Sequence, residues 1–214
     1  MNYTMMTDFY ELTMANGYFL SGKKDEIVYF DLYYRDVPDR GGFAIFAGLK
    51  DIVEYIQNLK FTKKDIDFLR SKNIFSEEFL KYLKDFKFSG DIYAMPEGSV
   101  FFPGEPVMTV RAKAIEAQLI ETYVLAVFNH QSLIATKANR VVRAAKGRVV
   151  SEFGARRAHG AEAAYKGARA AYIGLVNSTS NTLADVLFGI PASGTMAHSW
   201  VQMFDTELEA FETY

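Results

Sequence analysis

The residues best suited to phosphate chemistry lie in the segment 190–200, which reads I-P-A-S-G-T-M-A-H-S-W. Small residues here lead from a short apolar run into an expected helix. Small side chains let backbone N–H groups approach an anion, and a helix N-terminus adds partial positive charge. Gly194, Thr195 and His198 therefore form a candidate phosphate-binding loop, in which the imidazole could bind phosphate or accept it as a nucleophile. The alternative is that His198 is an ordinary capping or core histidine.

Two earlier segments repeat this order of strand, junction and helix. The segment 148–153 predicts a strand that Gly154 ends, Arg156 and Arg157 follow it, and the alanine-rich stretch 161–171 predicts a helix. An arginine pair at the end of a strand is a candidate site for an anionic ligand. The alternative is a solvated pair on the protein surface.

The next unit predicts a strand at 172–176 and a helix at 182–188, and the third predicts a strand at 189–193 and a helical segment at 199–211. The junction of the second unit is rich in residues that cap helices, namely Ser178, Ser180 and Asn181. Three such units in a row predict parallel strands with helical crossovers, in an α/β barrel or an open α/β sheet. Active sites in both lie where strands lead into helices, so we expect the three junctions to share one site.

Composition favours a folded, soluble protein. Half of the 214 residues are apolar and 23% are charged. No apolar run approaches the roughly 20 residues that a membrane-spanning helix needs, and no signal peptide precedes residue 7. Cysteine is absent, which rules out disulfides and thiolate sites and fits a reducing compartment. We therefore expect a cytoplasmic protein with no membrane partner.

The net charge of −2 hides an uneven distribution. Between residues 137 and 169 only Glu152 and Glu162 are acidic. The same stretch holds nine basic residues: Lys137, Arg140, Arg143, Lys146, Arg148, Arg156, Arg157, Lys166 and Arg169. This local excess predicts an anionic partner. A small phosphorylated substrate fits better than nucleic acid, because no nucleic-acid-binding motif is visible and the rest of the chain is acidic.

The N-terminal part predicts a mixed α+β domain. Thr7 is the expected cap of a helix at 8–20, and 26–35 predicts a strand with alternating faces. Further helices are expected at 49–59 and after the caps Thr62 and Ser76. Three short strands are expected at 91–95, 99–102 and 107–111.

A long helical stretch at 114–145, with an expected break at 129–131, joins this domain to the parallel units. We therefore predict a domain at residues 1–131 and a second domain that begins at 132 and runs to 214. We find no P-loop, no G-x-G-x-x-G fingerprint and no metal-binding histidine pair in the sequence, and we predict no protein-held metal.

Five stretches carry a combined signature. They are T-D-F-Y-E-L-T-M-A from residue 7, Y-V-L-A-V-F-N-H-Q-S-L-I-A-T-K-A-N-R-V from 123, S-E-F-G-A-R-R-A-H-G from 151, N-S-T-S-N-T-L-A from 177 and A-S-G-T-M-A-H-S-W from 192. Together they resemble the nicotinate phosphoribosyltransferase family. The resemblance implies an enzyme of the Preiss–Handler route to NAD, which forms nicotinate mononucleotide from nicotinate and phosphoribosyl pyrophosphate with coupled ATP hydrolysis. It also implies an irregular α/β barrel, incomplete in this chain, joined to an N-terminal α+β sandwich domain.

The resemblance assigns roles to individual residues. Tyr10 matches the tyrosine that covers the pyridine ring from the partner subunit of a homodimer with shared active sites. Phe153 matches the aromatic residue on the opposite face of the ring. Arg156 matches the arginine beside the substrate, with Arg157 as a weaker candidate, and Thr195 matches the threonine that contacts nicotinate. The alternative for the helix that carries Tyr10 is that it packs on its own domain.

His198 matches the histidine that ATP phosphorylates. Mg²⁺ would arrive through phosphate oxygens, and no tightly bound organic cofactor is expected. The junction that contains Ser178, Ser180 and Asn181 has no acidic residue. Related nicotinamide-using enzymes place an aspartate there, which would repel a carboxylate, so its absence favours nicotinate.

Family members are longer, and three parallel strands cannot close a barrel. We therefore expect the natural chain to continue past Tyr214, with further donor-binding residues there. Two alternatives stay open. One is a nicotinamide or quinolinate phosphoribosyltransferase of the same fold class, and the other is a non-catalytic binding module of that fold.

Overall fold

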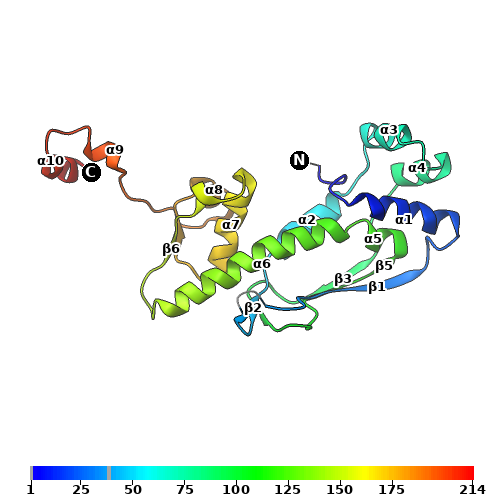
Figure 1. Cartoon of the computed structure of the whole chain (residues 1–214), viewed down its shortest axis with the longest axis horizontal. Coiled ribbons are helices and arrows are strands. Elements are labelled where there is room, and N and C mark those ends of the chain that lie inside the picture. The colour runs from blue at the N-terminus through cyan, green and yellow to red at the C-terminus, as the bar shows by residue number, and fades with distance from the viewer. Residues whose placement is uncertain (1, 38–39) are drawn as a thin grey trace.

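The computed structural model describes residues 2–37 and 40–214. The molecule is elongated, with an N-terminal α+β part towards one end and short strand–helix units towards the other (Figure 1). The long helix α6 (Glu121–Ala144) runs between them and contacts both β2 of the N-terminal part and α7 of the C-terminal part. Among the described residues no helix has the apolar length that crossing a membrane requires.

The N-terminal part holds a three-stranded antiparallel sheet in the order β1-β5-β3. Its strands are β1 (Ile27–Leu32), β3 (Asp91–Ala94) and β5 (Met108–Lys113). A second antiparallel pair joins β2 (Ala44–Ile45) to β4 (Val100–Phe101). The strands expected at 26–35, 91–95, 99–102 and 107–111 are thus confirmed; the first three are shorter than expected, and the last runs on to Lys113. The mixed α+β character of this part is confirmed as well.

Alternation along β1 explains how the sheet meets the core. Ile27, Tyr29 and Asp31 are exposed, whereas Leu32 is buried, and Val28 and Phe30 pack against the hydrophobic core. Successive side chains of a strand point to opposite faces, so one apolar set faces inward. The core beneath is rich in aromatic rings, and Tyr34 lies 4.5 Å from Phe128 between ring centroids.

Five helices cover this part: α1 (Phe9–Leu20), α2 (Leu49–Asn58), α3 (Lys63–Ser71), α4 (Glu77–Lys84) and α5 (Ala114–Gln118). The predicted caps Thr62 and Ser76 are confirmed, since each side chain accepts a hydrogen bond from the first turn of its helix. The predicted cap Thr7 is wrong. Asp8 occupies the N-cap position of α1, and the Thr7 hydroxyl donates instead to the buried Glu11.

The break in the long helical stretch is also elsewhere than expected. It falls at Leu119–Ile120, between α5 and α6, and α6 passes unbroken through 129–131. Gln131 and the next residue, Ser132, bind neighbouring elements and do not interrupt the helix. The Gln131 amide donates to Asp51 of α2, and the Ser132 hydroxyl donates to the Ala47 carbonyl at 3.1 Å.

The C-terminal part contains the expected parallel arrangement. The strand β6 (Ser151–Glu152) pairs in parallel with β7 (Ser178–Thr179), and Thr179 forms a parallel bridge with Ala192. The strand expected at 189–193 is reduced to this single bridge, and we call the segment 190–193 the third strand. The helices are α7 (Ala161–Ile173) and α8 (Thr182–Phe188), as predicted within two residues. Within the described residues these strands form no closed barrel.

The second strand, however, is not at 172–176. Tyr172 and Ile173 complete α7, and the chain turns at Gly174 and at Leu175, whose φ is 80°. A Cβ at Gly174 would lie 2.4 Å from the Ala135 carbonyl of α6, so the apolar run serves close helix packing. The strand begins only at Ser178.

The expected helix at 199–211 is divided. The structure has a single turn, α9 (His198–Val201), and a separate helix, α10 (Glu207–Thr213). The Trp200 indole donates to the Ala210 carbonyl at 3.0 Å and holds the two together. This pair lies apart from the other elements at one end of the molecule (Figure 1).

Candidate active site

The parallel register gathers several predicted site residues at one edge. Ser180 N donates to the Glu152 carbonyl at 2.9 Å, and Ser193 N donates to the Thr179 carbonyl at 2.9 Å. The carboxyl ends of β6, β7 and the third strand therefore lie side by side. Ser178 lies within β7, and the predicted site residues that follow these ends directly are Phe153, Ser180, Asn181, Gly194 and Thr195.

The short sheet has two different faces. On one, the Thr179 hydroxyl donates to the Glu152 carboxylate at 2.8 Å. Thr179 is fully buried, and Ile190 of the third strand packs against Ala168 of α7 and Ala184 of α8, so these helices cover this face. The other face carries serine hydroxyls and points away from the helices. The predicted site residues have to be sought on this second face.

The three predicted residues at and after β7 have different surroundings. The Asn181 side chain accepts a hydrogen bond from Ala184 N at 3.3 Å and caps α8. Ser178 is 9% exposed, and its hydroxyl contacts other serines. Ser180 is exposed. The structure thus uses Asn181 for folding, while the side chain of Ser180 is open to solvent.

Arg156 and Arg157 lie on the short 3-10 turn η2 (Ala155–Arg157), directly after β6. Both are exposed, and neither forms an ion pair with any residue that the structure describes. Phe153, just before them, is 41% exposed. An exposed ring beside two unpaired guanidinium groups can bind a flat anionic ring through stacking and charge.

His198 does not lie beside β6 and β7 as the sequence predicts. Thr195 and His198 are exposed, and the chain between the third strand and α9 leads away from β6 and β7 (Figure 1). Because α9 has only four residues, the helix-dipole argument for this histidine is wrong. The residues 194–198 remain a candidate phosphate loop through their small side chains and exposed imidazole.

Tyr10 lies in α1, far along the molecule from β6, so one chain does not bring it to Phe153 (Figure 1). Its ring is 46% exposed, and its hydroxyl donates to Glu121 Oε1 at 3.1 Å. Partial burial and this hydrogen bond raise the pKa of Tyr10 to about 12, so the phenol stays neutral at physiological pH. The neighbouring Phe9 and Met14 are exposed too.

Part of the basic excess proves to be internal. Lys166 pairs with the buried Asp51 of α2, and Arg169 binds Glu97 through two hydrogen bonds of 3.0 and 2.6 Å. Burial alone would raise the pKa of Glu97, but its contacts with Arg169 hold the pKa below the ordinary value. The interpretation of these two cations as part of an anion site is therefore wrong, because carboxylates distant in the sequence neutralise them.

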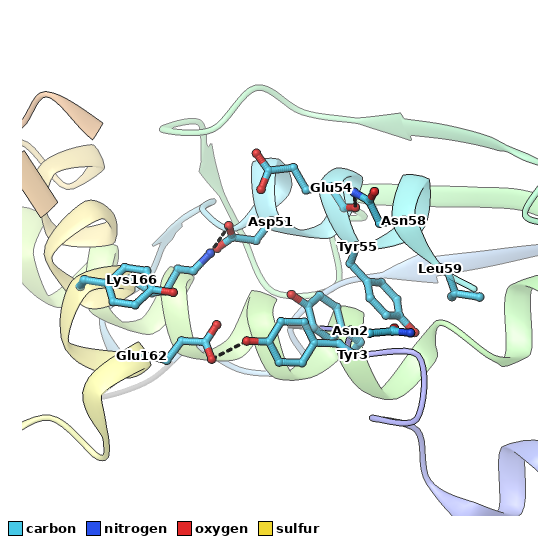
Figure 2. Close-up of a pocket in the computed structure, with 11 residues that line it drawn as sticks. Asn2, Tyr3, Asp51, Glu54, Tyr55, Asn58, Leu59, Glu162 and Lys166 are labelled. Carbon is cyan, nitrogen blue, oxygen red and sulfur yellow. Dashed lines mark hydrogen bonds and ion pairs between the residues drawn. The ribbon is translucent and has the colours of Figure 1, made fainter. Parts of the chain in front are cut away.

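The Lys166–Asp51 pair borders a cavity of about 290 Å³ between α2, α7 and the N-terminal segment (Figure 2). Tyr3 donates to Glu162 across it at 2.6 Å, beside the Lys166–Asp51 pair. The rings of Tyr55 and Tyr123 stack on its far wall with centroids 3.8 Å apart. Sequence reasoning missed this cluster. The only available signal was the spacing of Glu162, Lys166 and Arg169 along one helix face.

Comparisons with known proteins identify the family. The sequence model for the nicotinate phosphoribosyltransferase (NAPRTase) N-terminal domain matches residues 5–129, and the model for the NAPRTase family matches residues 149–213. The chain is 47% identical over 210 residues to nicotinate phosphoribosyltransferase pncB2 of Mycobacterium tuberculosis, covering 98% of this chain and 45% of the relative. Identity to the Bacillus subtilis enzyme is 44% over 211 residues, covering 99% and 43%.

Solved structures agree. Human nicotinic acid phosphoribosyltransferase superposes with a TM-score of 0.86 at 36% identity, over 92% of this chain and 40% of that structure. The nicotinate-nucleotide pyrophosphorylase of Pyrococcus furiosus superposes with a TM-score of 0.79 at 25% identity, over 99% and 46%. The chain spans less than half the length of these relatives. From its matched residues and its fold, this chain belongs to the nicotinate phosphoribosyltransferase family.

Proposed function

We propose that the protein carrying this chain transfers a phosphoribosyl group from phosphoribosyl pyrophosphate to nicotinate. The observation that carries the proposal is the parallel register of β6, β7 and Ala192, which gathers Phe153, Ser180 and the 193–195 loop at one edge. The names of the curated relatives supply the reaction. The proposal concerns the full-length protein.

The acceptor pocket would use the unpaired residues after β6. Phe153 would stack on the pyridine ring, and Arg156 would bind its carboxylate, with Arg157 close by. Thr195 and Ser180 would complete the polar wall. No acidic side chain lies in the junction 178–181, and the nearby Glu152 carboxylate is engaged with Thr179 on the helix-covered face. A carboxylate substrate therefore meets no negative side chain of the junction that would repel it on the open face.

The reaction needs positioning and charge stabilisation. The pyridine nitrogen would attack the anomeric carbon of the ribose as the bond to pyrophosphate breaks, through an oxocarbenium-like transition state. Held reactants convert this into an effectively unimolecular step, and cationic groups stabilise the departing pyrophosphate. Magnesium would enter as part of the donor, through its phosphate oxygens.

The coupling to ATP would run through His198. An imidazole nitrogen would take the γ-phosphoryl group of ATP, releasing ADP, and water would later hydrolyse the phosphohistidine. The exposure of His198 and the small residues before it support this role, because a nucleotide can reach the ring.

The fine architecture is also part of the proposal. An N-terminal sandwich domain at 1–131 and a barrel portion at 132–214 fit the two ranges that the family models match, 5–129 and 149–213. The exposed Phe9, Tyr10 and Met14 support a homodimer in which Tyr10 reaches the partner's acceptor pocket.

A substrate assay tests the function. Full-length protein is incubated with phosphoribosyl pyrophosphate, MgATP and, separately, nicotinate, nicotinamide or quinolinate, and the mononucleotide product is measured. Turnover of nicotinate, at least 100-fold above the other two acceptors, is expected. Preference for another acceptor would assign the protein to that reaction, and ligand binding without turnover would favour the non-catalytic alternative.

A further inference from the structure

Three serine hydroxyls form a continuous chain across the three parallel strands. Ser178 Oγ lies 2.7 Å from Ser151 Oγ and 2.8 Å from Ser193 Oγ. Ser178 is 9% exposed, whereas Ser151 and Ser193 are exposed. The chain therefore has a buried middle and two open ends.

The hydrogen-bonded serine hydroxyls lie on the face that α7 and α8 leave open. Phe153, Ser180 and Thr195, the residues proposed to contact substrate, each follow one of the serines by two positions, just after the paired segments end. The serines thus lie at the strand ends that lead to the proposed site.

The number of hydroxyl protons limits how the three serines can hydrogen-bond to one another. Three hydroxyls carry three protons, and the two contacts between them use two. If the third proton stayed on Ser178, a buried donor would be left without an acceptor, because its hydroxyl contacts only these two serines within the described chain. The remaining proton therefore lies on Ser151 or on Ser193, where it can be donated to a ligand.

The surroundings favour the Ser193 end. A Cβ added at Gly194, the next residue, would meet no atom within 4 Å, so a ligand has space to approach. A Cβ at Gly154, beyond the Ser151 end, would lie 2.8 Å from the Glu152 carboxylate. The space beside Gly154 is therefore filled, whereas the space beside Gly194 is open.

From these observations we propose that Ser193 donates a hydrogen bond to an anionic oxygen of a bound substrate, and that Ser178, which contacts it directly, orients its hydroxyl. The oxygen belongs to the pyridine carboxylate or to a phosphate of the donor. This assignment of substrates rests on the proposed function. Ser193 is then a binding residue, and Ser178 is a positioning residue.

Calorimetry on the full-length protein tests the proposal, with sodium nicotinate and inorganic pyrophosphate as separate probes. Ser193→Ala should weaken binding of one of the two anions about 10-fold, as expected for a lost hydrogen bond to a charged group, and the affected anion identifies the oxygen. Ser193→Thr, which keeps the hydroxyl, should restore binding to within about threefold. Ser178→Ala should weaken the same anion by a smaller factor, about threefold, because Ser193 keeps its proton but loses its orientation.

Ser151→Ala is the matched control, since it removes the far end of the chain, and it should change neither affinity by more than about twofold. Equal effects of Ser151→Ala and Ser193→Ala, no effect of Ser193→Ala, or no binding of either anion to the wild type would overturn the proposal. Thermal unfolding of each variant separates loss of binding from loss of fold. Turnover by the wild type is recorded separately, so failure of the proposed reaction is distinguishable from failure of this assignment.

Discussion

Two pairs of cations on neighbouring segments differ sharply in their surroundings. Lys166 and Arg169 on α7 are largely buried and paired with carboxylates of the N-terminal part. Arg156 and Arg157 on the preceding turn are exposed and, in the part of the chain that the structure describes, have no ion-pair partner. In the sequence both pairs are simply basic residues, with one pair following the other along the chain. The comparison separates charges that hold α7 in place from charges that are available to a ligand.

The largest effect is expected where a pair is buried. Lys166→Met leaves the Asp51 carboxylate, which is 4% exposed, without its cation. An uncompensated buried charge typically costs about 3–5 kcal/mol. The thermal unfolding midpoint of the full-length protein should therefore fall steeply. Arg156→Met is the control and should leave the midpoint within about 2 °C, because an exposed substitution costs about 0.5 kcal/mol or less. Similar midpoints for the two variants would erase the distinction between the pairs.

The exposed pair of arginines is expected to affect substrate binding. Arg156→Ala should lower kcat/KM for nicotinate about 10- to 100-fold, since a charge-assisted hydrogen bond contributes about 1.5–3 kcal/mol. Steady-state kinetics with varied nicotinate measure it, and Arg157→Ala, the weaker candidate, should show a smaller loss. A kcat/KM for Arg156→Ala within twofold of the wild type would show that this arginine does not bind the substrate.

The pH dependence of stability tests the contribution of the second buried pair, Arg169 and Glu97. Arg169 holds the pKa of Glu97 below its unfolded value, so this pair stabilises the fold above the ordinary pKa of a glutamate, about 4.3. That stability is lost as the pH falls through the lower folded pKa. Glu97→Gln should reduce the free energy of unfolding by about 1.5 kcal/mol at pH 7 and by less at pH 3. Denaturation curves at both pH values check this, and an equal difference at the two would show that ionisation of Glu97 is irrelevant.

The smallest effect is expected far from both pairs of cations. Thr62→Ala removes the side chain that accepts from Asp65 N at 3.3 Å, and loss of an N-cap typically costs about 1 kcal/mol. Urea denaturation should show this loss, whereas kinetic constants for nicotinate should not change. Altered kinetics would mean that α3 takes part in the site.

Local signals in the sequence were sufficient for much of the fold. The caps Thr62, Ser76 and Asn181 and the alternation along β1 depend on residues a few positions apart, and all four follow from the sequence. The order of strand, junction and helix predicted three parallel strand segments, and the matched family gave the fold class. Candidate residues such as Phe153 and Ser180 could be named because they follow those strands directly.

Tertiary structure decided what depends on distant partners. Lys166 meets Asp51 across 115 positions, and no local pattern identifies that carboxylate as its partner. The break between α5 and α6 and the start of β7 at Ser178 also differ from the local pattern, because Gln131 and Gly174 serve contacts with other elements. The serine chain exists only because parallel pairing aligns three separate strands. Hydrogen bonds and ion pairs form between neighbours in space, and the chain alone specifies those neighbours only once it has folded.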